Sequence, residues 1–447
     1  MALLDYSRIA AAIPQQAQRL IVGYSGGVDS LVLLHLCATQ PDLVGRILAV
    51  YVHHGLQAVA DDWERHCAKQ TVRLGVAFRS IKVDARPRNG ESPEAAARRA
   101  RYAALQPLLG DGDVLLLAQH REDQMETLLL QLFRGAGVQG LAAMPVAAPF
   151  GRGVMLRPLL DVGKQGILDY ARQHGLSWVD DPSNLDSDFD RNFLRHRIVP
   201  LLKQRWPALD KTVARSASLC GEAQLLVKSW VVEALTQLVE PDSQALLLDG
   251  LRLYAEAQRH GLLREWLAGH GLQPPSRAVL DAIENQLVAA RDDAEPQIEL
   301  QGRILKKYRR RLYCLRPEFF SSVVGDLVWP DGDSVLALAN GGLVSRVDSE
   351  TGIAQSLWHA ARVVLRPRVG GERFKLPGRD GRHELKKLYQ EAGIPPWERR
   401  ARPLLYLDGR LAAVPGLWVG EWACAEHYKA CYRLNWEYAG NRIDTTP

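Results

Sequence analysis

The sequence has little of what marks secreted, membrane-spanning or metal-clustered proteins. Only six of its 447 residues are cysteines, and no two of them have the CxxC spacing of a zinc site or a redox pair. No apolar run approaches the roughly 18 residues of a membrane span, and the N-terminus lacks the basic start of a secretory signal. We therefore expect free thiols in a reducing compartment, the cytoplasm, and no association with a membrane.

A strong excess of charge of one sign is also absent. The chain has 56 basic and 51 acidic residues, which gives a net charge of +5, so the distribution of charge matters more than its sum. An apolar fraction of 47% is ordinary for a folded protein. At roughly 150 residues per domain, the length predicts two to four domains.

The most informative stretch lies near the N-terminus. Leu20 to Gly23 has the character of a short buried strand, and the apolar run from Leu31 has that of a helix. Two glycines between them let the backbone turn sharply, and two serines add hydroxyl donors. Because N–H groups at a helix start attract anions, we expect a phosphate cradle. Its members are Ser25, Gly26, Gly27, Val28, Asp29 and Ser30.

Asp29 is the unusual member of this cradle, because a phosphate repels a carboxylate unless a cation lies between them. We therefore interpret Asp29 as a Mg²⁺ contact. The simpler alternative is a turn in which Asp29 or Ser30 caps the helix and no ligand binds. The spacing excludes a Walker loop. The letters SGGVDS instead resemble the pyrophosphatase loop (PP-loop) of the ATP-pyrophosphatase superfamily, whose members bind ATP, transfer AMP to a substrate oxygen and release pyrophosphate.

Strands alternate with helices through the first half of the chain. Buried strands are predicted at 47–53, 78–83 and 113–120, and helices at 58–74, 92–109 and 163–175. This alternation predicts an α/β fold with a parallel sheet covered on both faces and ligands at the carboxyl ends of its strands. SGGVDS, His53-His54 and Gln119 to Asp123 all fall at such ends, which predicts one shared active site.

Two groups of arginines could serve that site. Arg98 and Arg101 share one face of a predicted helix, where their planar guanidinium groups suit phosphates. Arg191, Arg195 and Arg197 could bind substrate or nucleic acid. The alternative for both groups is a solvated, salt-bridged helix face.

Glu122 and Asp123 form the second acidic group at the strand ends. Together they suit a Mg²⁺ site opposite Asp29. Alternatively, Asp123 simply caps the following helix, and Glu126 answers from three residues on.

A zinc site is a weaker interpretation of the nearby histidines. His53-His54 and His66-Cys67 contain metal-binding residue types. However, adjacent histidines at a strand end seldom chelate one ion, and His66-Cys67 falls on a predicted helix. We therefore prefer a structure without zinc.

The second half is helical first and basic later. Amphipathic patterns fill residues 223–300, and the segment 301–317 holds seven basic residues, no acidic one, and two tyrosines, Tyr308 and Tyr313. Phosphate contact with some base stacking fits this segment, and a basic exposed hairpin is the alternative. Residues 318–360 are weakly patterned, and we treat them as a connector. A new basic unit with apolar strands follows from residue 361.

A set of motifs extends the resemblance over most of the chain. They are SGGVDS, HHGL from His53, E..AR..RY from Glu94, EDQMET from Glu122, RG.G..GL from Arg134, DPSN from Asp181, DRNFLR from Asp190, LKK from Leu385 and IPPWER from Ile394. Their order resembles that in the tRNA(Ile)-lysidine synthase family. Gln119 and Glu122 depart from the family, which usually has His and Asp there.

The resemblance implies a fold and a division of the chain. It implies a PP-loop ATP-binding catalytic domain at 1–222, a helical tRNA-binding domain at 223–317, a connector at 318–360 and a small α+β tRNA-binding C-terminal domain at 361–447. It leaves the chain a monomer or a homodimer.

The resemblance also implies a reaction and its participants. ATP, with Mg²⁺, adenylates the C2 oxygen of the wobble cytidine in tRNA(Ile) with anticodon CAU, and free L-lysine then displaces AMP to give lysidine, which changes the codon read from AUG to AUA. Catalytic roles fall to Asp29, Asp123, Arg98 and Arg191, and Mg²⁺ contacts to Asp29, Glu122 and Asp123. Contacts to tRNA fall to Arg101, Arg195, Lys306, Lys307, Arg309, Arg373, Lys386 and Lys387.

Two other functions fit parts of the sequence. A tRNA 2-thiolation enzyme has the same loop, but it relies on paired cysteines or an iron–sulfur site, which the cysteine spacing does not supply. A nucleotide-sensing RNA-binding module without turnover would keep SGGVDS and the basic segments, but it would have no use for Glu122-Asp123. Lysine-dependent formation of AMP distinguishes both from lysidine synthesis.

Overall fold

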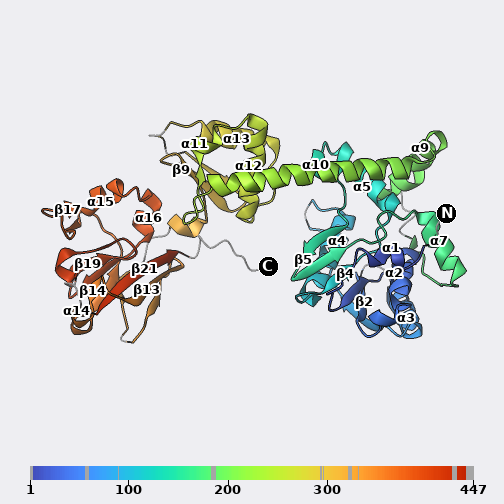
Figure 1. The fold of residues 1–447 in the computed structure, drawn as a ribbon, viewed down its shortest axis with the longest axis horizontal. Coiled ribbons are helices and arrows are strands. Elements are labelled where there is room, and N and C mark those ends of the chain that lie inside the picture. The colour runs from blue at the N-terminus through green and yellow to red at the C-terminus, as the bar shows by residue number, and fades with distance from the viewer. Residues whose placement is uncertain are drawn as a thin grey trace. The chain divides into compact units, whose positions relative to one another are not determined.

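The structure is a computed structural model, which describes residues 4–55, 60–88, 90–182, 188–291, 294, 296–320, 325–330, 332–424 and 430–438. The chain divides into two compact units between Lys228 and Ser229, called unit 1 and unit 2 below (Figure 1). Within the described ranges, no helix combines the length and apolar character needed to cross a bilayer.

Unit 1 is built on one six-stranded sheet. Its strands are β1 (Leu20–Gly23), β2 (Ile47–His53), β3 (Ala77–Lys82), β4 (Val114–Leu116), β5 (Ala147–Phe150) and β6 (Gly153–Leu156). They lie in the order β3-β2-β1-β4-β6-β5, and all run parallel except β5. The predicted parallel sheet is confirmed. The strand predicted at 113–120 is shorter, because pairing ends before the chain turns into the next helix.

Helices bury both faces of this sheet, as expected for parallel strands. Leu20 and Val22 of β1 pack into one core, whereas Ile21 between them packs into the core on the opposite face. The helices are α1 (Ser7–Ala10), α2 (Val28–Ala38), α3 (Ala60–Arg73), α4 (Pro93–Leu105), α5 (Arg121–Phe133), α6 (Val138–Leu141) and α7 (Lys164–Gln173). The carboxyl ends of β1 and β4 therefore lead directly into α2 and α5.

A run of helices closes unit 1, and its last helix continues into unit 2. The run comprises α8 (Asp190–Phe193), a π-helical turn (Leu194–Ile198), α9 (Val199–Arg205) and the 30-residue α10 (Leu209–Leu238). The helical run is interrupted between α9 and α10, around Pro207. The predicted boundary between 222 and 223 falls within α10.

Unit 2 begins with a helical part that packs on a small antiparallel sheet. The helices are α11 (Leu248–Leu251), α12 (Glu256–Gly269) and α13 (Arg277–Ile283), and the strands are β7 (Leu246–Leu247), β8 (Gln297–Leu300), β9 (Arg303–Tyr308) and β10 (Arg311–Leu315). Leu262, Leu305 and Leu312 are fully buried in their shared core. The basic segment at 301–317 is therefore the β9–β10 hairpin.

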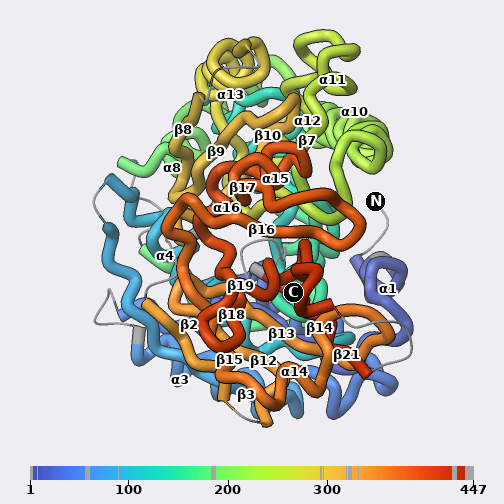
Figure 2. The backbone as a smooth tube through the Cα atoms, turned by 90° about the vertical axis from the view of Figure 1, so that its left-hand side faces the viewer, coloured from blue at the N-terminus to red at the C-terminus, as the bar shows by residue number. Residues whose placement is uncertain are grey.

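The remainder of unit 2 forms two antiparallel sheets. One contains β11 (Leu327–Val328), β15 (Val363–Arg366), β18 (Leu404–Leu407), β19 (Arg410–Val414) and β20 (Trp418–Val419). The other contains β12 (Val335–Ala337), β13 (Gly342–Ser349), β21 (Cys431–Tyr438) and β14 (Ile353–Ala354). Figure 2 shows β15, β18 and β19 side by side. Residues 327–354, expected within a connector, supply strands to both sheets.

Short helices and a two-stranded ribbon complete this part of unit 2. They are α14 (Gln355–Ala360), β16 (Arg373–Phe374), β17 (His383–Glu384), α15 (Leu385–Glu391) and α16 (Pro396–Ala401). The expected mixed α+β character of the C-terminal part is confirmed.

Candidate active site

The PP-loop joins β1 to α2 in the conformation that its glycines predict. Gly26 has φ of +86°, and a Cβ there would lie 2.9 Å from the Cys67 Sγ, so no larger residue fits without a shift. The Ser25 N–H donates to the Ser30 Oγ at 3.2 Å, and the Ser30 Oγ donates to the Gly27 carbonyl at 3.0 Å. The start of α2 thus remains an anion-binding end with Asp29 in its first turn.

Asp29 is paired with a lysine that the sequence did not single out. The Lys164 ammonium, on the first residue of α7, lies 2.6 and 2.8 Å from the two carboxylate oxygens of Asp29. The His120 Nε2 lies 3.8 Å from Asp29 Oδ1 and 3.5 Å from Asp123 Oδ2. Asp29 and Asp123 therefore both approach the same nitrogen of one imidazole.

His120, rather than Asp123, precedes α5 as its N-cap residue. The Asp123 carboxylate accepts the His120 backbone N–H at 3.0 Å from its position three residues on. The alternative prediction, in which Asp123 is the N-cap residue, is therefore wrong, because Asp123 lies three residues after the N-cap. Burial opposes ionisation of Asp123, but the charges of His120, Arg191 and Arg195 hold its pKa below the usual range.

Glu122 is occupied by contacts with neighbouring residues. Its Oε2 lies 3.1 Å from the His120 Nδ1 and accepts the Lys164 backbone N–H at 2.9 Å. Burial raises the pKa of Glu122, but these hydrogen bonds outweigh burial and lower the pKa to about 2. Glu122 thus holds the start of α7, and with it Lys164, next to the PP-loop.

A buried carboxylate, Glu126, lies behind Asp123 and binds two arginines. The Arg195 Nε and Nη2 donate to its two oxygens at 2.7 and 2.8 Å, and Arg195 Nη2 also lies 3.1 Å from Asp123. The Arg191 Nε lies 3.2 Å from Glu126, and its Nη2 donates to the Thr127 hydroxyl at 2.7 Å. Burial raises the pKa of Glu126, and Arg195 and Arg191 limit that rise.

These elements surround one pocket of about 410 Å³. Its polar lining comes from Ser25, Asp29, Ser30, His54, Glu94, Arg98, Arg101, Gln119, Asp123, Asp181 and Arg191. Val50, Val52, Leu105 and Leu117 supply apolar walls. The structure therefore brings together the PP-loop, the arginines of α4 and the residues after β4, whereas Glu122 does not line the pocket.

The pocket fits ATP and Mg²⁺ by the chemistry of its donors. Mg²⁺ is commonly held by one or two carboxylates together with substrate phosphates, and Asp29 and Asp123 offer two carboxylates to one pocket. Apolar walls next to an anion-binding helix end suit a nucleotide. Glu122, the third residue expected to contact Mg²⁺, does not line the pocket and instead contacts His120 and Lys164.

Two of the histidines considered for zinc, His53 and His66, make other contacts. His53 Nδ1 accepts the Gly55 N–H at 3.1 Å, and His53 Nε2 lies 3.1 Å from Asp61. His66 Nε2 lies 3.1 Å from the Ser177 carbonyl oxygen, and Cys67 is buried beside the PP-loop. His53, Asp61 and Glu64 are close enough to hold an ion, but they do not include Cys67.

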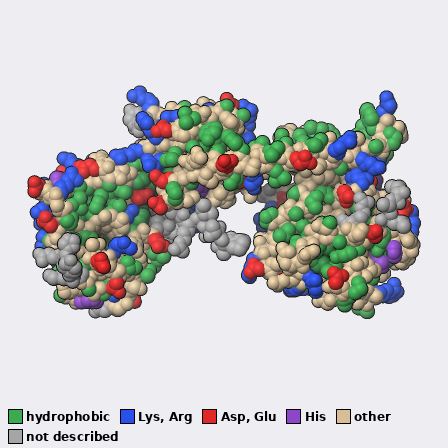
Figure 3. Space-filling model, viewed as in Figure 1, with side chains coloured by type: hydrophobic (Ala, Val, Ile, Leu, Met, Phe, Trp, Pro, Cys, Tyr) green, Lys and Arg blue, Asp and Glu red, His purple; other side chains and the backbone are tan. Residues whose placement is uncertain are grey.

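The residues expected to contact tRNA differ in their exposure. Arg101, Arg309, Arg373, Lys386 and Lys387 are exposed, and Figure 3 shows Lys and Arg side chains over the edge of unit 2 that carries α15. Lys307 is 2% exposed, and its ammonium donates to the Ala290 carbonyl, so it presents no charge to a phosphate.

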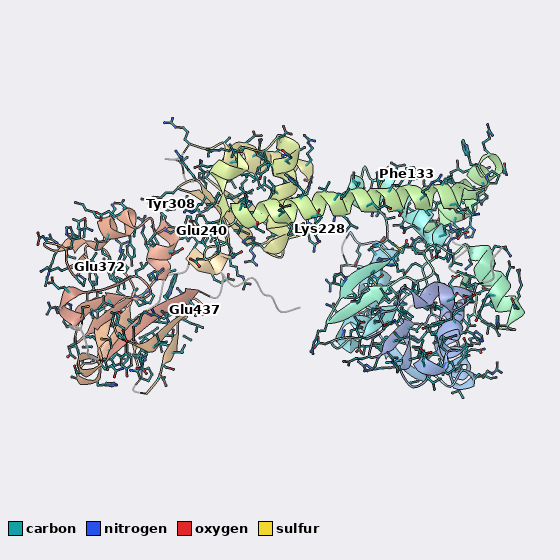
Figure 4. The ribbon with its side chains drawn as sticks, viewed as in Figure 1. Phe133, Lys228, Glu240, Tyr308, Glu372 and Glu437 are labelled. Carbon is teal, nitrogen blue, oxygen red and sulfur yellow. The ribbon has the colours of Figure 1, made fainter. Side chains whose placement is uncertain are left out.

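Two aromatic residues and Lys306 belong to a cluster inside unit 2. Tyr313 is buried against Trp397, so stacking of Tyr313 on a base is excluded. The hydroxyl of Tyr308, labelled in Figure 4, accepts from Arg399 at 3.0 Å, and the Lys306 ammonium lies 5.7 Å from the centre of the Trp397 ring.

Comparison with known proteins gives three consecutive domain matches. Residues 4–202 match the PP-loop domain, residues 246–313 the TilS substrate binding domain, and residues 363–436 the TilS substrate C-terminal domain. The fold and site thus define a PP-loop protein that uses ATP.

Relatives of similar length narrow this class. The tRNA(Ile)-lysidine synthase of Methylococcus capsulatus is 43% identical and is aligned over 93% of this chain and 94% of its own. That of Serratia proteamaculans is 39% identical over 97% and 99% of the two chains, and that of Xanthomonas campestris is 39% identical over 92% and 93%. The chain belongs to the tRNA(Ile)-lysidine synthase family, a family of tRNA-modifying ligases.

Proposed function

We propose that this chain joins L-lysine to the wobble cytidine of a tRNA(Ile) with anticodon CAU, in two steps and with Mg²⁺ as cofactor. In the first step the cytidine C2 oxygen attacks the α-phosphorus of ATP, and pyrophosphate leaves. In the second step the ε-amine of lysine attacks C2, and AMP leaves with the oxygen. The observation that carries the proposal is the convergence of the PP-loop, Asp29, Asp123 and Arg191 on one pocket.

The first step requires stabilisation of the charge on the leaving pyrophosphate. We assign the phosphate cradle to Ser25 through Ser30, because the helix start and two hydroxyl groups meet there. Arg98 and Arg191 line the same pocket and are the proposed partners of the phosphates. Mg²⁺, held by Asp29 and Asp123, would neutralise phosphate charge.

The second step requires a deprotonated amine next to a carboxylate. Asp123 is the proposed partner of the lysine substrate, because its carboxylate lines the pocket and is kept ionised by His120, Arg191 and Arg195. Glu122 is an indirect contributor, because its hydrogen bonds position His120 and Lys164.

The tRNA must present an unstacked cytidine to this pocket. Extrusion of a base costs stacking energy, so we propose that basic surfaces elsewhere on the chain hold the tRNA by its backbone. The exposed Lys386 and Lys387 of α15 are candidates in unit 2. Arg195 donates a hydrogen bond to Glu126, so we propose that it supports the pocket and does not contact tRNA.

The deciding experiment measures pyrophosphate release from ATP, with and without a tRNA(Ile) transcript bearing CAU and with and without lysine. Release that needs the transcript, together with lysine-bearing tRNA as product, is expected. Release that is indifferent to lysine would keep adenylation and reject lysine as the acceptor. Release without tRNA would reject the proposed substrate.

A single substitution tests the PP-loop carboxylate. Asp29→Ala is expected to keep tRNA binding and abolish pyrophosphate release, because the side chain lies in the nucleotide pocket. Normal release would reject its role in holding Mg²⁺. A nucleotide-sensing module would bind ATP and tRNA but form no lysine-dependent AMP.

A further inference from the structure

The side-chain oxygen of Gln119 lacks a hydrogen-bond partner among the residues that the structure describes. This atom, Oε1, is buried, and Gln119 lines the pocket just beyond β4. A buried acceptor without a donor is unfavourable, and such atoms are rare in folded proteins. A buried acceptor without a donor, on a residue that lines a substrate pocket, points to a donor that the ligand supplies.

The surroundings of Gln119 suit a planar base. Leu105, Leu117 and Ala118 supply apolar lining to the same pocket, while the PP-loop supplies its anion-binding end. A carboxamide oxygen can accept from the exocyclic amine of cytosine or of adenine. These two bases share the chemistry that Gln119 would recognise.

The position of Gln119 favours the cytosine. Gln119 directly precedes His120, whose Nε2 lies 3.8 Å from Asp29 Oδ1, and Gln119 lines the same pocket as Asp29 and Asp123. The acceptor base must approach the α-phosphorus near these carboxylates, whereas the adenine amine is at the far end of its own nucleotide.

We propose that the Gln119 carbonyl accepts a hydrogen bond from the exocyclic amine of the cytosine that is adenylated, so that Gln119 is a specificity-determining residue. The inference rests on the proposed function, because it takes the wobble base as the occupant. Uracil carries an acceptor where cytosine carries this amine, so the contact discriminates between the two bases.

The test compares binding of two tRNA(Ile) transcripts, with C or U at the wobble position, in the presence of an ATP analogue that cannot release pyrophosphate. Gln119→Leu removes the acceptor and is expected to reduce the preference for C over U about tenfold, the order expected for one hydrogen bond. Gln119→Glu keeps an acceptor but cannot rotate an amide donor into its place, so it is expected to keep or raise the preference. Gln16→Leu, at an exposed position, is the matched control and should leave it unchanged.

Three results would overturn the inference. They are a wild-type protein that does not distinguish C from U, a Gln119→Leu protein with unchanged preference, and a Gln119→Glu protein with lost preference. If Gln119→Leu does not fold, the Gln119→Glu result decides.

A separate arm measures binding of the ATP analogue without tRNA. An approximately tenfold loss in Gln119→Leu, with the C-over-U preference intact, would assign the contact to adenine and overturn the cytosine assignment. Because both arms measure binding, they remain informative even if wild-type protein releases no pyrophosphate, a result that would reject the proposed function itself.

Discussion

The Arg195–Glu126 pair makes a quantitative prediction about stability and pH. The Glu126 side chain is 2% exposed, and Arg195 donates to both of its oxygens at 2.7 and 2.8 Å. Arg195→Met removes this partner and leaves a buried carboxylate with Arg191 alone. Breaking a buried ion pair in this way typically costs about 3–5 kcal/mol of unfolding free energy.

Protonation of Glu126 sets an upper limit on this cost. Starting from an ordinary pKa of 4.5, neutralising the carboxyl group costs about 1.4 kcal/mol for each pH unit above that value. The limit is therefore about 4 kcal/mol at about pH 7.5 and about 1.4 kcal/mol at about pH 5.5. Because Arg191 remains 3.2 Å away, we expect losses of about 3 and about 1 kcal/mol.

The sign follows from proton binding. Loss of Arg195 raises the folded-state pKa of Glu126 further above its unfolded value, so the folded protein binds more protons than the unfolded one. The destabilisation is then full above the raised pKa and disappears as pH falls towards 4.5. Stability of the variant relative to wild type must therefore improve on acidification.

Scanning calorimetry of the full chain at both pH values measures this effect. The transition of unit 1 is identified by its upward shift with ATP, since a ligand stabilises the unit that binds it. Arg197→Met, at an exposed position in the same π-helical turn, is the control and should change stability by less than about 0.5 kcal/mol. Equal destabilisation by Arg195→Met at both pH values would refute the reasoning. So would an Arg195→Met/Glu126→Gln double variant that is no more stable than Arg195→Met.

Five lysine and glutamate side chains support three further predictions. Lys164→Met removes a cation that competes with Mg²⁺, so the Mg²⁺ concentration for half-maximal ATP binding should fall about two- to fivefold. A rise in this concentration would contradict the prediction. The control, Lys164→Arg, should behave like the wild type. Glu122→Gln should lower the free energy of unfolding by about 2 kcal/mol above about pH 5.5, and by progressively less as pH falls from 4.5 towards 2. The reason is that the lowered pKa contributes stability only while the wild-type carboxyl group is ionised. A loss that does not depend on pH, measured by urea unfolding, would exclude this role. Lys307→Met should lower stability and leave the salt dependence of tRNA binding unchanged. The Lys386→Ala/Lys387→Ala double variant should instead reduce the slope of the logarithm of the binding constant against the logarithm of salt concentration, by about 0.7–0.9 for each phosphate that the protein no longer neutralises. A slope equal to that of the wild type would place Lys386 and Lys387 outside the tRNA surface.

Local patterns were sufficient to predict the scaffold of the site. The PP-loop is encoded within six residues, because two glycines, two hydroxyls and a helix start need no distant partner to take this shape. The alternation of strands and helices predicted the parallel sheet, and the sheet then placed Asp29 and Asp123 at one pocket.

The contacts that tune the site could not be predicted in this way. Lys164 pairs with Asp29 across 135 residues of sequence, and Arg195 pairs with Glu126 across 69. Lysine at a helix start and glutamate in an amphipathic helix have ordinary solvent-exposed explanations, so local pattern gives no signal for either pair. The basic and aromatic residues around Lys307 and Tyr313 indicated that both contact tRNA at the surface. Both side chains are buried, so neither can do so.

Glu122 has a positioning role within this network of charges. The Glu122 Oε2 reaches the His120 ring and the backbone N–H of Lys164 at once, and none of these three residues lines the nucleotide pocket. A shorter aspartate on the same backbone would carry its charge one methylene closer to α5 and could not span both contacts without movement of α7. Glu122 therefore positions Lys164 from outside the pocket, and Asp29 and Asp123 are the two members of the expected Mg²⁺ set that line it.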